Sequence, residues 1–356
     1  MKGGYSLSTT SELNSGMDLR EVVISLLAGD EDAAAVNVRA ADMAYRAELR
    51  GVAEELARAA FTRGDRAALH TAHWVLGDIY DRCFSLPPIE QVDSLLGELL
   101  DDIRSVLENA MLADLSGRMD HSALACVPRD PESFLPWYRN FISSHTASNH
   151  PFYRDFLEKR ASAEDLRFYL AQETSLDPRF DDILSFLTVG TNGAEKMELV
   201  QNLWDEMGNG NPAEVHTTVF AKTLADAGVS KEFIDSNIML ESLVCGNVSA
   251  ALALSRRHCY KAFGYFGVTE YLTPRRFRSY IVGCRRLGMP GSAYVYHEQH
   301  IQIDARHGPA WFKNILLPAI AREPRCAAQI ALGTVMRLET STWYLDALQT
   351  RLELAG

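Results

Sequence analysis

The stretch YHEQHIQIDARH, residues 296–307, decides both the fold and the candidate site of this chain. Read as a helix, it places His300, Asp304 and His307 at positions i, i+4 and i+7, on one face and over about 10 Å of the helix axis. Imidazoles and a carboxylate on one face form a possible metal-binding ladder, although a solvated polar face would show the same spacing. His297 lies within one turn of this face, where it could be a ligand or a group that supports one.

The composition of the whole chain limits the classes of partner. With 356 residues and 47% apolar content, the chain can bury one large core and a smaller appended unit, which is what we expect. A net charge of -12 leaves no basic surplus for a phosphate backbone, so we expect no nucleic-acid partner. The start of the chain lacks a basic segment followed by an apolar run, and no stretch approaches the roughly 18 apolar residues of a membrane span. We therefore expect a soluble, cytoplasmic protein without a membrane partner.

The cysteines indicate neither a zinc site nor a disulfide framework. The chain has six of them, scattered without CxxC spacing. We expect buried, reduced thiols.

The chain is predicted to be all-α, in three parts. Residues 1–16 are rich in Gly, Ser and Thr, which predicts a flexible tail. Residues 17–130 are predicted to form a helical arm that mediates dimerisation, because such an arm without its own obvious large core usually buries apolar faces against a partner. Three prolines in CVPRDPESFLPW, residues 126–137, mark the boundary to a second helical unit, residues 131–356. In the arm, His70 and His73 are three residues apart, and we expect them on a helix surface.

Local signals predict where helices begin in the second unit. Ser162 with Asp165 resembles a capping box, and the pairs Asn211-Pro212 and Thr273-Pro274 each place a capping side chain before proline at the first helical position. We therefore expect Glu270 to end one helix just before the next begins.

Several ionisable residues lie on faces that should be buried. Glu173 is in line with Leu166 and Leu170, and Glu206 follows Leu199 and Leu203. His216 shares a face with Val219 and Phe220, while Glu270 continues the face of Phe263 and Phe266. Taken singly, each is explained by a satisfied polar group at the core or its rim. Together with the 296–307 ladder they match the carboxylate and imidazole set that two iron ions require, namely Glu173, Glu206, His216, Glu270, His300, Asp304 and His307.

These residues lack the Glu-x-x-His motifs of a four-helix ferritin-like site. The order Glu173, then Glu206-x9-His216, then Glu270, then His300-x3-Asp304-x2-His307 instead resembles the haem-oxygenase-like diiron oxidases. The segments NLWDEMGNGNPAEVH (202–216), GYFGVTEYLTP (264–274) and YHEQHIQIDARH (296–307) carry the resemblance, which covers roughly residues 131–356.

The resemblance implies a haem-oxygenase-like bundle of about seven core helices that binds two Fe(II) ions and uses O2 as cosubstrate with an external electron donor. Members of the family catalyse N-oxygenation, oxidative C–C cleavage or desaturation. Glu206, which resembles the additional carboxylate of N-oxygenating members, and the helical arm favour an N-oxygenase that forms a homodimer. The expected substrate is a small amine, arylamine, aminoimidazole or guanidine in natural-product biosynthesis. Because no cupin follows the bundle, we expect the reaction to stop at the oxygenated nitrogen.

The resemblance also suggests how the ligands divide between the two irons. Glu173, His216 and His307 are expected around one iron, and Glu270, His300 and Asp304 around the other. Glu206 is expected to join one iron or to bridge both.

Other readings remain open at this point. On the same diiron site the chain could be an oxidative decarboxylase or a desaturase of an amino or fatty acid, which would need a carboxylate anchor. A haem oxygenase would use a single axial histidine, and a binding module would need no ligand set. The arginines between residues 275 and 286 could form a solvated helix face or a clamp for a substrate carboxylate, and they are Arg275, Arg276, Arg278, Arg285 and Arg286.

Overall fold

The computed structural model describes residues 18–28 and 33–354, and these residues form helices and turns without a strand. The predicted all-α fold is confirmed, while the predicted tail, residues 1–16, lies outside the described residues. The chain divides into two compact units, Met1–Asp114 and Leu115–Gly356. The division falls inside helix α5 (Leu96–Arg118), whereas the sequence prediction placed it at the prolines after residue 126.

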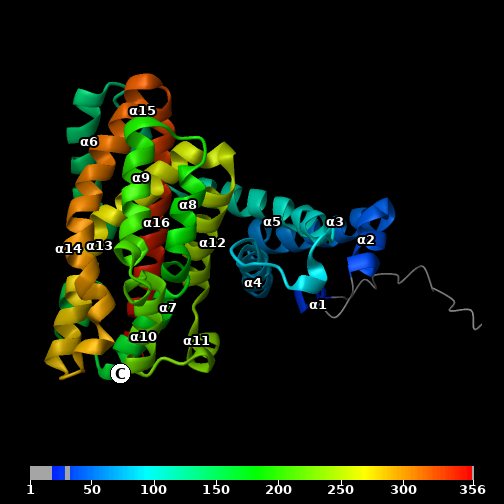
Figure 1. The fold of residues 1–356 in the computed structure, drawn as a ribbon, viewed down its shortest axis with the longest axis horizontal. Coiled ribbons are helices and arrows are strands. Elements are labelled where there is room, and N and C mark those ends of the chain that lie inside the picture. Colours follow the sequence, from blue (N-terminus) through cyan, green and yellow to red (C-terminus); the bar gives the residue numbers. More distant parts are fainter. Residues whose placement is uncertain (1–17, 29–32, 355–356) are drawn as a thin grey trace, which may run out of the picture. The chain divides into compact units, whose positions relative to one another are not determined.

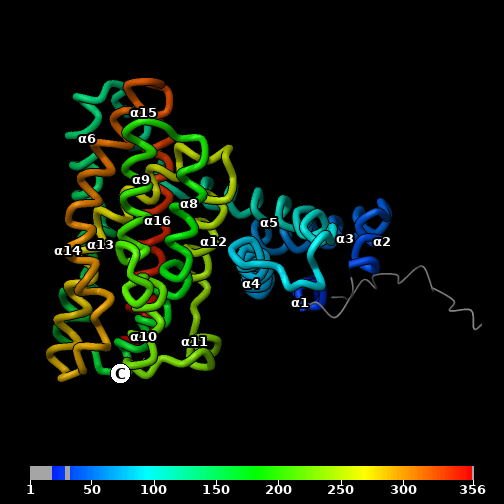
Figure 2. The backbone as a smooth tube through the Cα atoms, in the orientation of Figure 1, coloured from blue at the N-terminus to red at the C-terminus, as the bar shows by residue number. Residues whose placement is uncertain are grey.

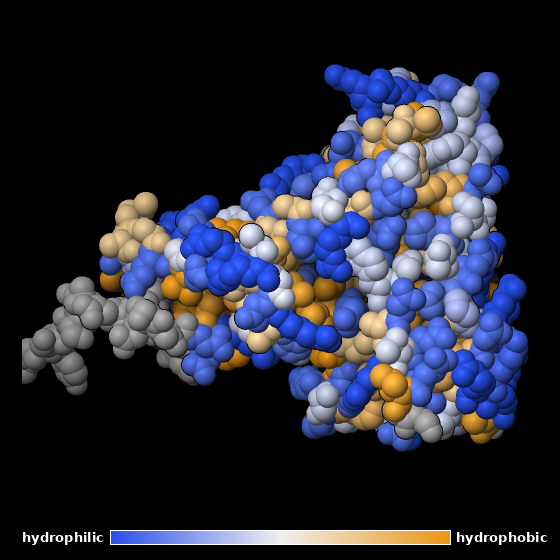
Figure 3. All heavy atoms as spheres, turned by 180° about the vertical axis from the view of Figure 1, so that it is seen from behind, coloured by the Kyte–Doolittle hydropathy of each residue, from blue (hydrophilic) through white to orange (hydrophobic). Residues whose placement is uncertain are grey.

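The N-terminal unit has a hydrophobic core of its own. Its further helices are α1 (Leu19–Ala28), α2 (Ala33–Ala41), α3 (Met43–Ala57), a π-helical turn (Arg58–Thr62), α4 (Arg66–Cys83) and a 3-10 turn (Ile89–Gln91). Asp42 and Asp65 cap α3 and α4 by accepting hydrogen bonds from backbone N–H groups of the first turn. Leu49, Leu76 and Leu99 are completely buried. Figure 3 nevertheless shows hydrophobic residues, in orange, on the face of this unit turned to the viewer.

One histidine of the pair in this unit differs from the prediction, since His70 is exposed as predicted but His73 is not. His73 is buried, not on a helix surface, and its ring lies 5.8 Å from that of Phe61 in an edge-on contact. His70 lies 3.3 Å from Trp74, whose indole N–H donates to the imidazole. The prediction failed because α4 turns its His73 face towards the π-helical turn that contains Phe61.

The C-terminal unit is a bundle of helices (Figure 1). The longest are α13 (Cys259–Arg286) and α16 (Cys326–Glu353), and α13 packs along both α14 (Val295–Trp311) and α16. Figure 2 shows α14, in orange, rising to α15 at the top, and α16, in red, returning from there to the C-terminus at the bottom, so the two helices run in opposite directions. The remaining α-helices are α6 (Pro131–Ser144), α7 (Ala163–Glu173), α8 (Phe180–Thr188), α9 (Gly193–Glu206), α10 (His216–Ala227), α11 (Lys231–Asn237), α12 (Leu240–Leu254) and α15 (Leu317–Arg322).

Shorter turns connect these helices. They are 3-10 turns at Ser122–Cys126, Thr146–Ser148, Asp177–Arg179, Gly208–Gly210, Pro212–Glu214, Arg256–His258 and Gly291–Ala293, and π-helical turns at Phe152–Leu157 and Phe312–Leu316. The capping box of Ser162 and Asp165 is present at the start of α7, as predicted. Asn211 caps only the short turn Pro212–Glu214, and α10 begins later, at His216.

The prediction that a helix begins at Thr273-Pro274 is wrong, because α13 continues through Pro274. Proline removes a backbone donor inside a helix. Beside the proline, the hydroxyl of Thr273 donates a 2.8 Å hydrogen bond to the carbonyl oxygen of Thr269. Glu270 therefore lies in the middle of a long buried helix and not at a helix end.

Glycines let the central helices approach one another closely. A Cβ atom at Gly264 of α13 would lie 1.9 Å from the carbonyl oxygen of Ile330 on α16, and one at Gly333 would lie 1.9 Å from that of Lys261. Neither position can accept a side chain unless the helices separate, so these two glycines set the spacing between α13 and α16.

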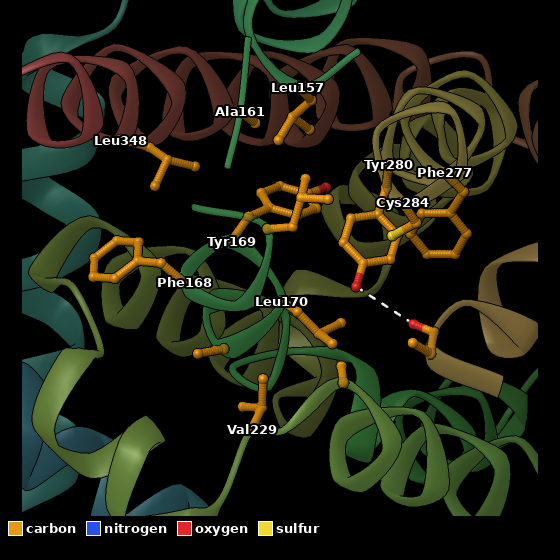
Figure 4. Close-up of a cluster of buried hydrophobic side chains, with 14 of the residues drawn as sticks. Leu157, Ala161, Phe168, Tyr169, Leu170, Val229, Phe277, Tyr280, Cys284 and Leu348 are labelled. Carbon is orange, nitrogen blue, oxygen red and sulfur yellow. Dashed lines mark hydrogen bonds between the residues drawn. The ribbon is translucent and has the colours of Figure 1, made fainter. Parts of the chain in front are cut away.

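A cluster of buried side chains joins α7, α13 and α16 (Figure 4). Leu157, Leu170, Tyr280, Cys284 and Leu348 are completely buried in it. The Tyr280 hydroxyl donates a 3.4 Å hydrogen bond to the carbonyl oxygen of Ala293 just before α14, drawn as the dashed line in Figure 4. This contact and the surrounding apolar packing support the start of α14.

Two further expectations concern the cysteines and membrane spans. All six cysteines are free, but Cys83 and Cys126 are exposed, so the expectation that all are buried is wrong for these two. Among the residues that the structure describes, no single helix has the length and hydropathy of a membrane span. Of these residues, α11 and α12 have that length and hydropathy only when they are taken together, across a bend of 102°.

Candidate metal centre

The candidate site lies where α9, α10, α13 and α14 meet. Glu206 is the last residue of α9, and His216 is the first residue of α10. The connecting turn has positive φ at Gly208, Asn209 and Gly210, with values of 59°, 53° and 87°. A Cβ atom at Gly208 would lie 2.5 Å from the backbone of Glu214, so glycine is required there for the chain to fold back. This turn brings His216 against Glu206.

The close packing of α13 against α14 places Glu270 beside the histidine ladder. A Cβ atom at Gly308, next to His307, would lie 2.7 Å from the Cα atom of Tyr271, next to Glu270. The two backbones therefore touch at the level of the candidate ligands, and the carboxylate of α13 reaches the face of α14.

The first cluster consists of Glu206, His216 and His300, each 3% or 4% exposed. Nδ1 of His216 lies 2.6 Å from Oε2 of Glu206, and Nε2 of His300 lies 3.7 Å from Oε1 of the same carboxylate. One ligand atom from each residue lies within 4.8 Å of the others, so one cation can reach all three.

The second cluster consists of Glu270, Asp304 and His307, which are equally buried. Nδ1 of His307 lies 3.7 Å from Oε2 of Glu270 and 3.8 Å from Oδ1 of Asp304. Residues of both clusters line one small cavity, namely Glu206, Glu270, His300 and Asp304. The two clusters therefore face a common space.

Hydrogen bonds fix which nitrogen of each α14 imidazole can act as a ligand. His300 lies with Nδ1 2.9 Å from the carbonyl oxygen of Tyr296, so Nδ1 donates and Nε2 keeps its lone pair. His307 lies with Nε2 2.8 Å from Oδ2 of Asp205, so Nδ1 is left to face Glu270 and Asp304. Orientation of a metal-binding imidazole by a carboxylate or carbonyl on its other nitrogen is common in metal sites.

The electrostatics of the two clusters reflect several buried carboxylates close together. Burial alone would raise the pKa of Glu206, but hydrogen bonds from His216 and His300 lower it to about 2. Burial, and then the charges of Glu270 and Glu206, raise the pKa of Asp304 well above its ordinary value. Burial alone would lower the pKa of His307, but the carboxylates of Glu270 and Asp205 raise it to about 9. A shared cation would relieve the repulsion that these shifts report.

Unsatisfied buried atoms show that the donor set fits metal ions. Oε1 of Glu270 and Nδ1 of His307 are buried and have no hydrogen-bond partner, and both belong to the second cluster. Such atoms are costly unless a ligand completes them. Mixed carboxylate and imidazole donors suit iron.

The structure does not bring Glu173 into either cluster. Its Oε2 lies 3.0 Å from Nε2 of His297, whose ring is completely buried against Phe277 and Tyr280. His297 thus contacts Glu173 and belongs to neither cluster. The grouping also differs from the expected division, because His216 lies with Glu206 and His300, and His307 lies with Glu270 and Asp304.

Two acidic residues of the site were not predicted from the sequence. Asp205 precedes Glu206 and orients His307. In the sequence it is only a second acidic residue beside Glu206. Asp177 lines the cavity beside Glu206 and His300, and its Oδ2 is buried without a partner. Its position before Pro178 indicated only a helix end.

A comparison with protein families supports this geometry. The sequence model of a family described as iron-containing redox enzymes matches residues 167–342, a range that includes all six residues of the two clusters. No curated protein matches the chain in sequence.

Proposed function

The chain belongs, through residues 167–342, to the iron-containing redox enzymes of the haem-oxygenase-like superfamily, and on this premise we propose that it is a non-haem diiron N-oxygenase. It is an iron-dependent oxidoreductase by family. The proposal adds that it uses O2 and an external reductant to oxygenate the nitrogen of a small amine, arylamine, aminoimidazole or guanidine in a biosynthetic pathway.

The observation that carries the proposal is the pair of buried three-residue clusters that face one cavity. Two ferrous ions bound there would supply the electrons and the open coordination positions that O2 requires. Glu206, His216 and His300 would hold one ion, and Glu270, Asp304 and His307 the other.

The protein's own groups would orient the ligands and shape the cavity. Asp205 and the Tyr296 carbonyl fix the imidazoles of His307 and His300, so each presents one lone pair to its ion. Phe180 and Phe277 line the cavity beside the clusters and limit the entry of water. A substrate nitrogen must be unprotonated to use its lone pair, and the cavity disfavours charge, because burial and the charges of Glu173 and Glu206 raise the pKa of Asp177 well above its usual value.

The test is anaerobic loading with Fe(II), followed by O2 and a chemical reductant in the presence of an amine panel. Mass spectrometry should find a hydroxylamine, nitroso or nitro product that contains 18O when 18O2 is used. Glu206→Ala should abolish this product. Absence of 18O from every nitrogen product, with release of CO2 or formation of an alkene, would refute N-oxygenation.

One observation favours a second candidate, an oxidative decarboxylase or other C–C cleaving enzyme that acts on an amino acid. The larger cavity beside the clusters contains two arginines, which suit a carboxylate anchor. It is also lined by Gln172, Ser175, Ser242 and Ser341, whose polar groups suit an amino acid.

A further inference from the structure

A larger cavity lies beside the one at the metal clusters. It contains about 620 Å³ of atom-free space, part of it open to solvent. The two cavities share part of their lining, namely Leu176, Asp177, Thr269, Thr273 and Phe277. A ligand in the larger cavity is therefore adjacent to the candidate metal ligands.

Two guanidinium groups line this larger cavity. Arg337 of α16 is only 8% exposed, and it donates hydrogen bonds to the hydroxyls of Thr269 (2.9 Å) and Ser341 (2.8 Å). Arg276 of α13 is half-buried, and its Nε and Nη2 atoms are inaccessible to solvent without a hydrogen-bond partner. In the part of the chain that the structure describes, no carboxylate oxygen lies within 4.0 Å of either guanidinium.

Such an arrangement is unfavourable without a ligand. A buried charge is costly unless it is paired, and arginine offers donors in a fork that matches a carboxylate. The hydroxyl partners of Arg337 satisfy hydrogen bonds but carry no compensating charge. The two guanidinium groups of this cavity therefore call for an anion.

Two carboxyl groups line the same cavity. They belong to Glu173 and Asp177, and Asp177 also lines the cavity of the clusters. A small molecule with a carboxylate at one end and a basic nitrogen at the other would match both pairs of groups.

A basic outer pocket leads to the arginines. It contains about 1150 Å³ of space, part of it solvent, and its basic lining consists of His150, Arg154, Arg275, Arg276 and Arg278. Arg276 and Tyr153 line both this pocket and the inner cavity. In a protein with a net charge of -12, this local concentration of positive charge attracts anions to this pocket.

We propose that Arg276 and Arg337 bind the carboxylate of the substrate, and that the substrate is a small amino acid whose basic nitrogen points towards the metal clusters. This inference rests on the proposed function, because it assigns the substrate class of that site. It also divides the arginines that the sequence grouped together. Arg276 serves as the clamp, whereas Arg285 pairs with Glu298 on the exposed surface.

The experiment uses the full chain loaded with Fe(II) under anaerobic conditions, with binding as the readout. Equilibrium dialysis against a mixture of the twenty proteinogenic L-amino acids, followed by mass spectrometry, should show retention of at least one of them. Parallel dialysis against the corresponding decarboxylated amines should show no retention. Retention of amines alone, or of no compound, would overturn the carboxylate assignment.

Variants then locate the site by calorimetric titration of the retained amino acid. Arg276→Gln should weaken its binding by roughly 10-fold to 100-fold, because a charged bidentate contact is lost. Arg276→Lys should bind with intermediate affinity, since it keeps the charge without the fork. Arg285→Gln, which removes the same charge from the same helix outside both cavities, should bind like the unaltered protein. Equal binding by Arg276→Gln, with its iron content and melting temperature unchanged, would refute the proposal.

The result separates this inference from the proposed function. An amino acid that binds through Arg276 but releases CO2 without N-oxygenation supports the carboxylate site and refutes the N-oxygenase. An amine that lacks a carboxylate but is N-oxygenated at full rate supports the N-oxygenase and overturns the carboxylate site.

Discussion

Replacing Asp205 by asparagine tests whether this residue orients a metal ligand. Oδ2 of Asp205 accepts a 2.8 Å hydrogen bond from Nε2 of His307, and both side chains are buried. Asparagine can still accept this bond but lacks the negative charge. Loss of such an orienting carboxylate typically lowers metal affinity about 10-fold to 100-fold, which corresponds to roughly 1.4–2.7 kcal/mol. The loss should be confined to the cluster of Glu270, Asp304 and His307.

The size of the effect should depend on pH. In the unaltered protein without metal, the pKa of His307 is raised to about 9, so metal binding at pH 7 must first displace a proton. Asp205→Asn lowers that pKa and thereby weakens proton competition, which partly offsets the loss of affinity. At pH 9 this offset becomes small, so the variant should show a larger defect at pH 9 than at pH 7.

The assay is anaerobic titration with Mn(II), a redox-stable probe, at both pH values, with bound and free ion distinguished by electron paramagnetic resonance. The unaltered protein should show two classes of Mn(II) site. Asp205→Asn should show the same two classes, one of them with lower affinity. Glu198→Gln is the matched control, because Glu198 is a buried carboxylate of the same helix that bonds to Asn202 and Asn314. Equal affinities of Asp205→Asn and the unaltered protein at both pH values would show that Asp205 does not orient a ligand.

Three further predictions concern iron, assembly and acid stability. Mössbauer spectroscopy should count two irons per chain, and saturation at one iron would contradict the dinuclear site. Glu206→Ala should lose the ion of its cluster. Glu298→Ala, which alters an exposed ion pair with Arg285, should keep both ions. The predicted homodimer should depend on the N-terminal unit, where exposed Ile24, Leu86 and Ile89 offer apolar contacts. Light scattering of residues 130–356 should therefore find a monomer. An unaltered dimer would place the interface elsewhere. Burial, together with Lys261 and Arg257, lowers the pKa of His258 from 6.5 to about 4, so the unfolded chain binds this proton first and stability falls as the pH drops from 6.5 towards 4. Urea denaturation of His258→Gln should show a smaller loss over this interval, and an identical loss would exclude His258 as its cause.

The sequence alone was sufficient wherever the relevant contacts are local. The spacing of His300, Asp304 and His307 places them on one face whenever the segment is helical, and the structure buries that face in α14. The capping box of Ser162 and Asp165 lies within four consecutive residues, so it too could be predicted. Helix periodicity and caps depend on neighbouring residues along the chain, and the sequence itself gives those neighbours.

Which helix meets which, and at what height, depended on tertiary packing. The contact of Gly308 with Tyr271 sets the height of α13 against α14, and it therefore decides that Glu270 joins His307. The division of the ligands between two clusters, the contact of Glu173 with His297 and the inward position of Arg276 arise in the same way. Periodicity predicts that a side chain is buried but not which partner it meets, because that partner comes from a distant segment whose position depends on close packing between helices.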